Sequence, residues 1–194
     1  MKKVCMAMIV GILTMNSLPI IAADTLPNGW FKAGSNPSDY KMGIDKDISF
    51  DGNKSAFIES DSADSKGFGT MMQSASVEDY RGKRVRLTVY IKTQDVSNWT
   101  GGWFRIDGNQ KKPLAFDNMK NRPINKTRDW SKYTMVLDVA NEATSMAYGV
   151  LLAGNGKVWF DNLSFEIVDK STPVTDFYAI KVQKKAKNLS FEND

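Results

Sequence analysis

The stretch that decides the fold covers residues 130–168 and contains three apolar runs separated by short polar turns. The runs are WSKYTMVLDV at 130–139, SMAYGVLLA at 145–153 and KVWFDNLSFEIV at 157–168. Each has the length of a strand and is rich in the branched and aromatic residues that strands favour. The last two flank Gly154-Asn155-Gly156, and glycine and asparagine accept the positive φ that a tight hairpin needs. The stretch therefore predicts a β-sheet core with a hairpin at 154–156.

Strands are also predicted on the N-terminal side of this stretch, most clearly at residues 84–93. One face carries Val85, Leu87, Val89 and Ile91, and the other carries Arg84, Arg86, Thr88, Tyr90 and Lys92. Such alternation is typical of a half-buried strand in an antiparallel sheet, because side chains point to opposite faces in turn. We therefore expect Leu87 to lie in the core.

Shorter strands are predicted at 40–45, 55–60, 68–75, 103–107 and 114–116, with loops at 99–102 and 117–129. The chain then has about nine strand candidates and no convincing amphipathic helix. This pattern predicts an all-β sandwich of about eight to nine antiparallel strands. The domain is expected to occupy residues 24–175.

The first 23 residues have the layout of a secretory signal peptide. Lys2 and Lys3 precede an apolar run at 4–21, and Ala22-Ala23 supplies the small residues of a cleavage site. The alternative is an uncleaved membrane anchor, but the run is interrupted and short for a comfortable span. We therefore expect an exported protein, periplasmic or secreted, with no membrane span after cleavage. Residues 176–194 are expected to form a polar tail or an extra strand.

The residue composition excludes several kinds of chemistry. Cys5, the one cysteine, lies within the predicted signal peptide, and the chain has no histidine. The mature protein is therefore expected to lack disulfides, a thiol nucleophile, an imidazole base and any His/Cys zinc site. No cofactor is expected to be required. The formal net charge of +4 falls by two when Lys2 and Lys3 leave, and basic residues are not gathered in one long run. Nucleic acid is therefore not expected as a partner.

The region 30–168 resembles the galactose-binding-like jelly rolls, the β-sandwiches of many carbohydrate-binding modules. Trp130 and Tyr133 are spaced as in the recurrent start of a strand in these modules, and residues 146–149 are similar to another of their strands. The segment GNGKVWFDNL at 154–163 resembles their "G.G.vw.Dnv" pattern. The resemblance implies a jelly-roll fold and says little about the ligand.

A narrower resemblance is to uncharacterised bacterial modules of this fold with a segment like FDNMKNRPI, here at 116–124. Such modules occur alone or joined to other domains, including regulatory ones, which implies binding or scaffolding more than catalysis. Modules of this fold often begin with a segment like "NL.FE". Here NLSFE stands at 188–192 instead, either as the start of a second module or as a last strand of the sheet.

A ligand site is predicted from aromatic and polar residues on the outward faces of strands. The set is Gln73, Tyr90, Trp103, Arg105, Asp117, Asn118 and Arg122. Aromatic faces stack on the C–H surface of sugars, while Arg, Asn, Gln and Asp bond the hydroxyls. If Phe104 and Ile106 face the core, Trp103 and Arg105 face away from it. The alternatives are an Arg105–Asp117 ion pair with Trp103 partly buried, and a simple Asp/Asn turn at 117–118.

Asp161 is a further candidate, because an Asp at this place in related jelly rolls can bind a structural calcium ion. Calcium takes carboxylate and carbonyl oxygens, but no second acidic ligand can be assigned from the sequence. The alternative is a structural role in capping a turn or strand.

The sequence favours a non-catalytic module that binds a carbohydrate or another small polar ligand, including a cell-envelope glycan. A protein-interaction or regulatory sensor module of the same fold is the main alternative. A weaker alternative is a carboxylate-dependent enzyme that acts on carbohydrates and uses pairs such as Asp45/Asp47 or Glu59/Asp61.

Overall fold

The computed structural model describes residues 26–176, which contain nine strands and two short 3-10 turns. The strands are β1 (Phe31–Gly34), β2 (Tyr40–Asp45), β3 (Ser55–Ser60), β4 (Phe68–Ala75), β5 (Arg84–Asp107), β6 (Ala115–Asp117), β7 (Ile124–Asp138), β8 (Ser145–Ala153) and β9 (Lys157–Val168). The 3-10 turns are η1 (Pro37–Asp39) and η2 (Glu78–Tyr80). Because this part of the chain contains no α-helix, the all-β prediction is confirmed.

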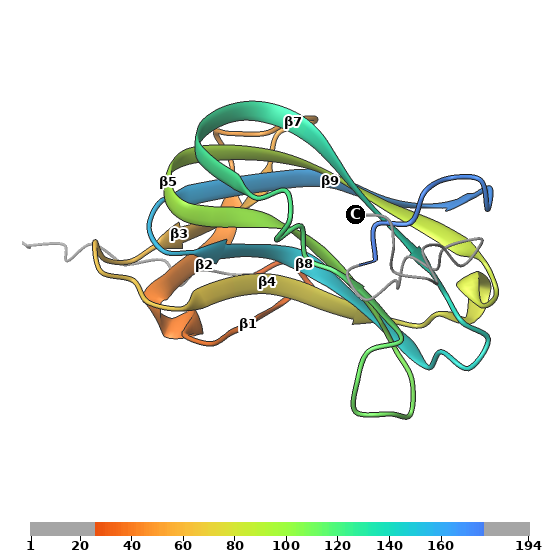
Figure 1. Ribbon diagram of the computed structural model, residues 1–194. Helices are drawn as coiled ribbons and strands as arrows, with labels where there is room; N and C mark the ends of the chain where they lie inside the picture. The colour runs from red at the N-terminus through yellow and green to blue at the C-terminus, as the bar shows by residue number, and fades with distance from the viewer. Residues whose placement is uncertain (1–25, 177–194) are drawn as a thin grey trace, which may run out of the picture.

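The long strand β5 joins two antiparallel layers. The strand order is β1-β4-β8-β5-β9-β3-β2, and β6 and β7 also pair with β5. Residues 84–94 of β5 pair with β9 and most of β7, whereas residues 99–107 pair with β8 and β6. We call the sheet of β1, β4, β8, β6 and the second half of β5 the front layer, and the rest the back layer. Figure 1 shows β7, β5 and β9 above β8 and β4.

The bend of β5 lies where its pairing with β7 is irregular. The register shifts between Ile91 and Thr93, again before Val96, and again before Thr100. Asp95 has a φ of 51°, and its partner strand has Lys126 at 63°. Bulges bend a strand and increase its local twist, which allows a single strand to pass from one layer into the other.

The core fills the space between the two layers. Val85, Leu87, Val89 and Ile91 of the first half of β5 are at most 1% exposed. They meet residues of the front layer such as Phe104, which is 0% exposed, in a single hydrophobic cluster. The alternation seen in the sequence is thereby confirmed, and Leu87 lies in the core.

The turn at 154–156 does not form a hairpin, so that prediction is wrong. Gly154 and Gly156 do adopt positive φ, at 72° and 122°. However, β8 pairs with β4 and β5, and β9 pairs with β3 and β5, so the two strands lie in different layers. The turn therefore connects the two layers. In the strand order, β5 lies between β8 and β9, the two strands that flank the turn.

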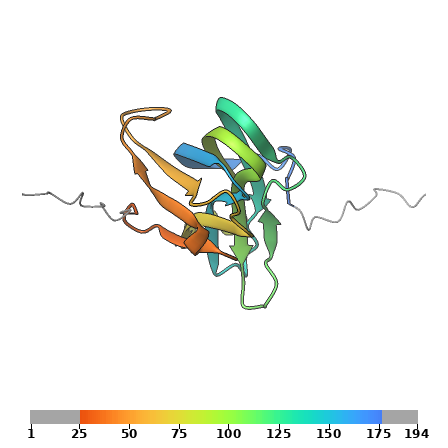
Figure 2. The same cartoon turned by 90° about the vertical axis from the view of Figure 1, so that its left-hand side faces the viewer.

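Two predicted loops are in fact parts of strands. Residues 99–102 continue β5, and residues 124–129 belong to β7. Glycine and polar residues suggested loops, but the backbone groups there pair with neighbouring strands. Strand β1 was not predicted; it adds to the edge of the front layer beside β4. The β2–β3 pair, orange in Figure 2, lies at the opposite end of the strand order.

Several predictions fall on residues outside the described range. They are the signal peptide at 1–23, the predicted tail at 176–194 apart from its first residue, and the NLSFE segment at 188–192. Within residues 26–176, no helix has the length and apolar character needed to cross a membrane. Residues 175 and 176 still contact the domain. Thr175 exchanges hydrogen bonds with Val136 of β7, and Asp176 Oδ1 accepts one from the backbone N–H of Phe116 at 3.0 Å.

Candidate functional site

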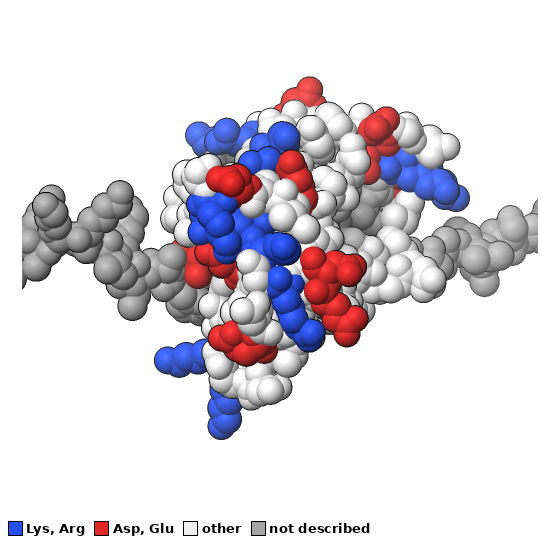
Figure 3. Space-filling view, turned by 90° about the vertical axis from the view of Figure 1, so that its right-hand side faces the viewer, with Lys and Arg blue, Asp and Glu red and all other residues white. Residues whose placement is uncertain are grey.

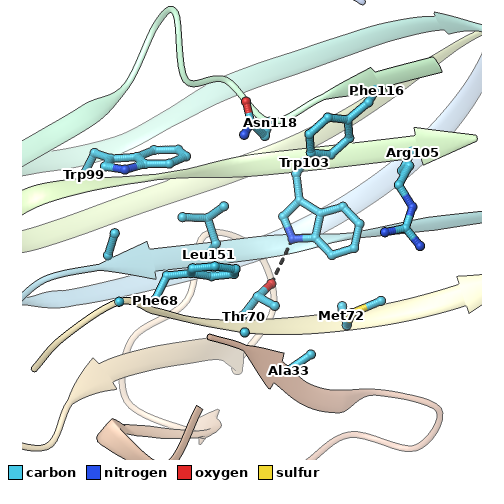
Figure 4. Close-up of a pocket in the computed structure, with 13 residues that line it drawn as sticks. Ala33, Phe68, Thr70, Met72, Trp99, Trp103, Arg105, Phe116, Asn118 and Leu151 are labelled. Atoms are coloured by element: carbon cyan, nitrogen blue, oxygen red, sulfur yellow. Dashed lines mark hydrogen bonds between the residues drawn. The ribbon is translucent and has the colours of Figure 1, made fainter. Parts of the chain in front are cut away.

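The outer surface of the front layer carries a hollow of about 500 Å³ (Figure 4). We call it the front hollow. Its lining comes from β1, β4, β5, β6 and β8, with residues on either side of them, and is mainly apolar. The lining residues are Ala33, Gly34, Gly67, Phe68, Thr70, Met72, Trp99, Trp103, Arg105, Phe116, Asn118, Leu151 and Ala153.

Strand alternation explains why these side chains meet. On β5, Trp99, Trp103 and Arg105 differ in position by even numbers and share the outward face. Phe104 and Ile106 point the other way and are 0% exposed in the core. The predicted parity of this strand is therefore confirmed, and it places Trp103 and Arg105 on the outer surface.

The sequence interpretation implied that Trp103 is a freely exposed platform. The structure shows instead that it is nearly buried. It is only 6% exposed and packs with Ala147, Leu151 and Ala153 in a small cluster on the outer side of the sheet. In the register, Gly149 stands opposite Trp103. Because Gly149 has no side chain, the indole can reach across β8 toward β4.

The indole of Trp103 is fixed by a hydrogen bond to a buried threonine. Trp103 Nε1 donates to Thr70 Oγ1 at 2.8 Å, drawn as a dashed line in Figure 4. Thr70 is 4% exposed, and its hydroxyl donates in turn to the backbone oxygen of Val150 at 2.7 Å. A buried hydroxyl normally has partners of this kind, because an unpaired polar group in the interior is costly. The hollow therefore has a preformed, rigid centre.

Less buried aromatic rings surround this centre. Phe68 is 36% exposed, and Trp99 and Phe116 are partly buried. In Figure 4, Trp99 and Phe68 lie toward one end of the hollow, and Phe116 lies beside Trp103. Phe116 is positioned by the pairing of β6 with β5, in which it stands opposite Arg105. Phe68 and Trp99 supply apolar faces that a ligand can contact.

Two polar side chains border the hollow. Arg105 has a side chain that is 39% exposed, and its Nε donates to Asp107 Oδ2 at 2.9 Å. Asn118 follows β6 and accepts a hydrogen bond from the backbone N–H of Lys120 at 3.1 Å through its Oδ1. The Arg105–Asp117 ion pair, which was the alternative to a binding site, does not form, and Arg105 pairs with Asp107 instead. Trp103, Arg105 and Asn118 are thus the predicted residues that meet in one place.

Asp117 and Arg122 do not line the hollow, although the sequence placed them there. Asp117 stands opposite Phe104, faces inward and is 2% exposed. Its carboxylate pairs with the Arg122 guanidinium, whose NH2 also donates to the Thr134 backbone oxygen at 3.0 Å. The pair holds the loop after β6 against β7, which is a structural role.

Gln73 and Tyr90 also lie elsewhere. Gln73 shares the inward parity of Met71 and accepts a hydrogen bond from the Tyr148 hydroxyl. Burial raises the pKa of that hydroxyl. Tyr90 does face outward, but from the back layer, where its ring stacks on Phe50 with centroids 3.7 Å apart. Outward residues of the two halves of β5 therefore reach different surfaces of the molecule.

Asp161 has partners that explain it without a metal ion. Its Oδ2 accepts hydrogen bonds from the backbone N–H groups of Phe50 and Asp51, at 3.0 and 3.2 Å, and its Oδ1 accepts one from Asn162 at 2.7 Å. Three N–H donors directed at one carboxylate do not fit a calcium site. Residues 26–176 also contain no cluster of three or more acidic, Cys or His side chains that could hold a metal ion. Calcium at Asp161 stays a prediction that this arrangement does not favour.

The charged surface is mixed rather than basic. On the face shown in Figure 3, Lys and Arg side chains lie beside Asp and Glu side chains. Ion pairs on the back layer follow the same pattern, such as Lys92–Asp129 at 2.7 Å and Arg86–Glu166 at 2.9 Å. Paired charges of this kind weaken any single-sign field.

Sequence reasoning missed several lining residues, notably Phe68, Trp99 and Phe116. The alternation of β4 already grouped Phe68 with Thr70 and Met72 on one face, so that signal was present. The sequence predicts a loop at Trp99, although this residue has the parity of Trp103. The sequence favours Asp117 over its neighbour Phe116, because the short strand at 114–116 gives no clear alternation.

No known protein-family model matches this chain. The chain is 40% identical over 168 residues to the uncharacterized HTH-type transcriptional regulator YbfP of Bacillus subtilis (strain 168). The match covers 86% of this chain and 57% of that regulator, so the chain spans a little over half the length of the curated relative that it matches.

Solved structures share the architecture. One is the CBM22-1 xylan-binding domain from Paenibacillus barcinonensis Xyn10C, with a TM-score of 0.54 and 13% identity over 75% of this chain and 90% of that one. Another is a family 16 carbohydrate-binding module, with a TM-score of 0.52 and 11% identity over 69% and 92% of the two chains. This chain has the jelly-roll fold of carbohydrate-binding modules.

The same jelly roll also occurs in an enzyme. A Stig cyclase, Fisc from Fischerella sp. TAU, matches with a TM-score of 0.55 and 17% identity, over 80% of this chain and 93% of that one. At such identities the similarity concerns the fold alone. The choice of function must therefore come from the front hollow.

Proposed function

We propose that this chain is an exported, non-catalytic module that binds a carbohydrate or a similar polyhydroxylated ligand in the front hollow. The observation that carries the proposal is the meeting of Trp99, Trp103 and Phe116 with Arg105 and Asn118 on one outward surface. Aromatic faces can stack on the C–H side of a sugar ring, while the guanidinium and amide groups bond its hydroxyls.

The rigidity of the hollow supports binding in particular. Trp103 is held by Thr70, and Arg105 by Asp107, so both side chains are already placed before a ligand arrives. Binding then costs less free energy, because these protein side chains do not have to be ordered. Proteins that share this fold include a xylan-binding domain and a family 16 carbohydrate-binding module, which supports such a use.

A second candidate function is favoured by one observation, the 40% identity to an HTH-type transcriptional regulator. A binding module within a regulator would serve as its sensor for a small ligand. On this alternative the front hollow keeps its role, and the bound state of the module is read by a protein partner.

A carbohydrate-active enzyme is the weaker alternative. Of the carboxylate pairs that the sequence offered, Asp45 receives a hydrogen bond from Trp159 Nε1 at 2.8 Å, and Glu59 borders a separate polar hollow with Lys157. Burial opposes ionisation of Asp45, but the Trp159 bond and backbone N–H groups outweigh it and lower its pKa. A carboxyl group with a lowered pKa is poorly suited to act as a general acid.

The proposal is tested with the chain 24–194 on a glycan array and in pull-downs with insoluble polysaccharides. We expect retention on at least one carbohydrate, and a loss of that retention in Trp99→Ala. Trp130→Ala is the matched control, because Trp130 is a partly buried aromatic of the back layer. Retention of no glycan, together with capture of one defined protein, would favour the interaction alternative. Release of reducing ends from a bound polysaccharide would favour the enzyme.

A further inference from the structure

We propose that the front hollow selects sugars that carry a carboxylate, and that Arg105 is the residue that binds this carboxylate. This inference rests on the proposed function, since it names the class of carbohydrate that the same hollow takes. It concerns the one lining residue of the front hollow, among those that the structure describes, that carries a formal charge.

The residues around Arg105 offer few other polar groups, so its charge has a large effect on which sugar binds. The other lining residues are apolar or neutral, and Thr70 already uses its hydroxyl for Trp103 and Val150. A neutral sugar would therefore find few hydroxyl partners beyond Asn118 and the guanidinium. An anionic sugar gains a charge-assisted hydrogen bond with the guanidinium, and such bonds are stronger than bonds between neutral groups.

The geometry leaves the guanidinium ready for a planar anion. Arg105 donates from Nε to Asp107, 2.9 Å away, and the side chain stays 39% exposed. Figure 4 shows the guanidinium at the far end of the hollow from Trp99, beside the Trp103 indole. Within residues 26–176, its terminal NH1 and NH2 groups donate to no protein acceptor, since the Arg105 bond to Asp107 uses Nε. Two parallel N–H groups match the two oxygens of a carboxylate.

The arrangement also fixes how the sugar would lie. The carboxylate of the ring meets Arg105, and the C–H face of the same or the next ring lies along the aromatic side chains between Arg105 and Trp99. Asp107 holds the guanidinium in place but repels the incoming anion, so it reduces the preference without removing it. We therefore expect a moderate selectivity of about tenfold, in line with a partly exposed charge-assisted pair.

The test uses pairs of oligosaccharides with the same linkage that differ only at C6, a hydroxymethyl group in one and a carboxylate in the other. Dissociation constants are measured by calorimetry at low and at high salt. We expect the acidic member to bind about tenfold more tightly at low salt and to lose most of that advantage at high salt. Equal affinities would overturn the carboxylate proposal while leaving carbohydrate binding intact. Binding of neither member of any pair would overturn the proposed function as well.

Two variants separate the charge from the fold. In Arg105→Gln the ratio of acidic to neutral affinity should fall to about one, whatever the absolute affinities become. In Asp107→Asn, whose amide oxygen still accepts the Arg105 Nε bond, the ratio should rise roughly two- to threefold because the repulsion is gone. Arg86→Gln, which removes a similar ion pair from the back layer, is the matched control and should leave the ratio unchanged. An unchanged ratio in Arg105→Gln would contradict the proposal.

Discussion

The hydrogen bond between Trp103 and Thr70 can be measured through a double-mutant cycle. Both residues are buried, at 6% and 4% exposure, and the donor and acceptor atoms are 2.8 Å apart. Trp103→Phe removes the donor, and Thr70→Val removes the acceptor. A buried neutral hydrogen bond contributes about 0.5–1.5 kcal/mol net. We expect a coupling energy of about 1 kcal/mol, which corresponds to about 2–4 °C in Tm for a domain of this size.

The assay is urea unfolding followed by far-ultraviolet circular dichroism, which mainly reports the backbone and so can be used in variants that lack Trp103. The Thr70 hydroxyl also donates to the Val150 backbone oxygen. That loss occurs in both backgrounds, so it cancels in the cycle. Trp103→Phe combined with Thr88→Val, in the back layer, serves as the control pair and should be additive within about 0.5 kcal/mol.

Trp103→Ala should be far more damaging, by roughly 3–5 kcal/mol, because it removes a nearly buried aromatic side chain. A coupling energy of zero in the cycle, or an unchanged Tm in Trp103→Ala, would refute the reasoning. Either result would mean that the indole is not fixed across β8, and the front hollow would lose its rigid centre.

Three further predictions concern stability. Leu87→Ala should cost roughly 2–5 kcal/mol in urea unfolding, because Leu87 is 0% exposed in the core. Gly156→Ala should destabilise by more than Gly52→Ala: both have positive φ, but a Cβ at 156 would lie 2.7 Å from the Val96 Cα, whereas one at 52 meets nothing within 4 Å. The Arg84 hydrogen bond lowers the pKa of the Asp138 carboxyl. The pair therefore stabilises the fold fully above pH 3.8, the usual pKa, and this stabilisation is lost as the pH falls through the lowered pKa. Asp138→Asn should make the free energy of unfolding depend less on pH in this acid range.

Local alternation was enough to predict most of the strands. The bounds of β2, β3, β4, β8 and β9 agree with the sequence interpretation, because each run is bordered by turn residues. The continuity of β5 could not be read in this way, since the glycines at 101 and 102 are characteristic of loops. Their strand conformation comes from pairing with β8, a long-range contact that local sequence does not contain.

The candidate site was predicted only where parity was known. Trp103 and Arg105 were placed on the outer surface because Phe104 and Ile106 had to face the core. Tyr90 was grouped with them because the sequence did not reveal that β5 passes from one layer to the other. The bend near Asp95 depends on irregular pairing with β7, and no pattern of residues in the sequence predicts this bend.

The central claim is that the front hollow is where a carbohydrate binds, and the indole N–H signals of the five tryptophans test it most directly. A two-dimensional ¹H–¹⁵N NMR titration is made with a carbohydrate that the protein retains. We predict that the signals of Trp99 and Trp103 move with ligand concentration, while those of Trp130 and Trp159, which belong to the back layer, stay in place. Movement confined to Trp130 and Trp159 would contradict the claim, as would the lack of any carbohydrate that moves the first two signals.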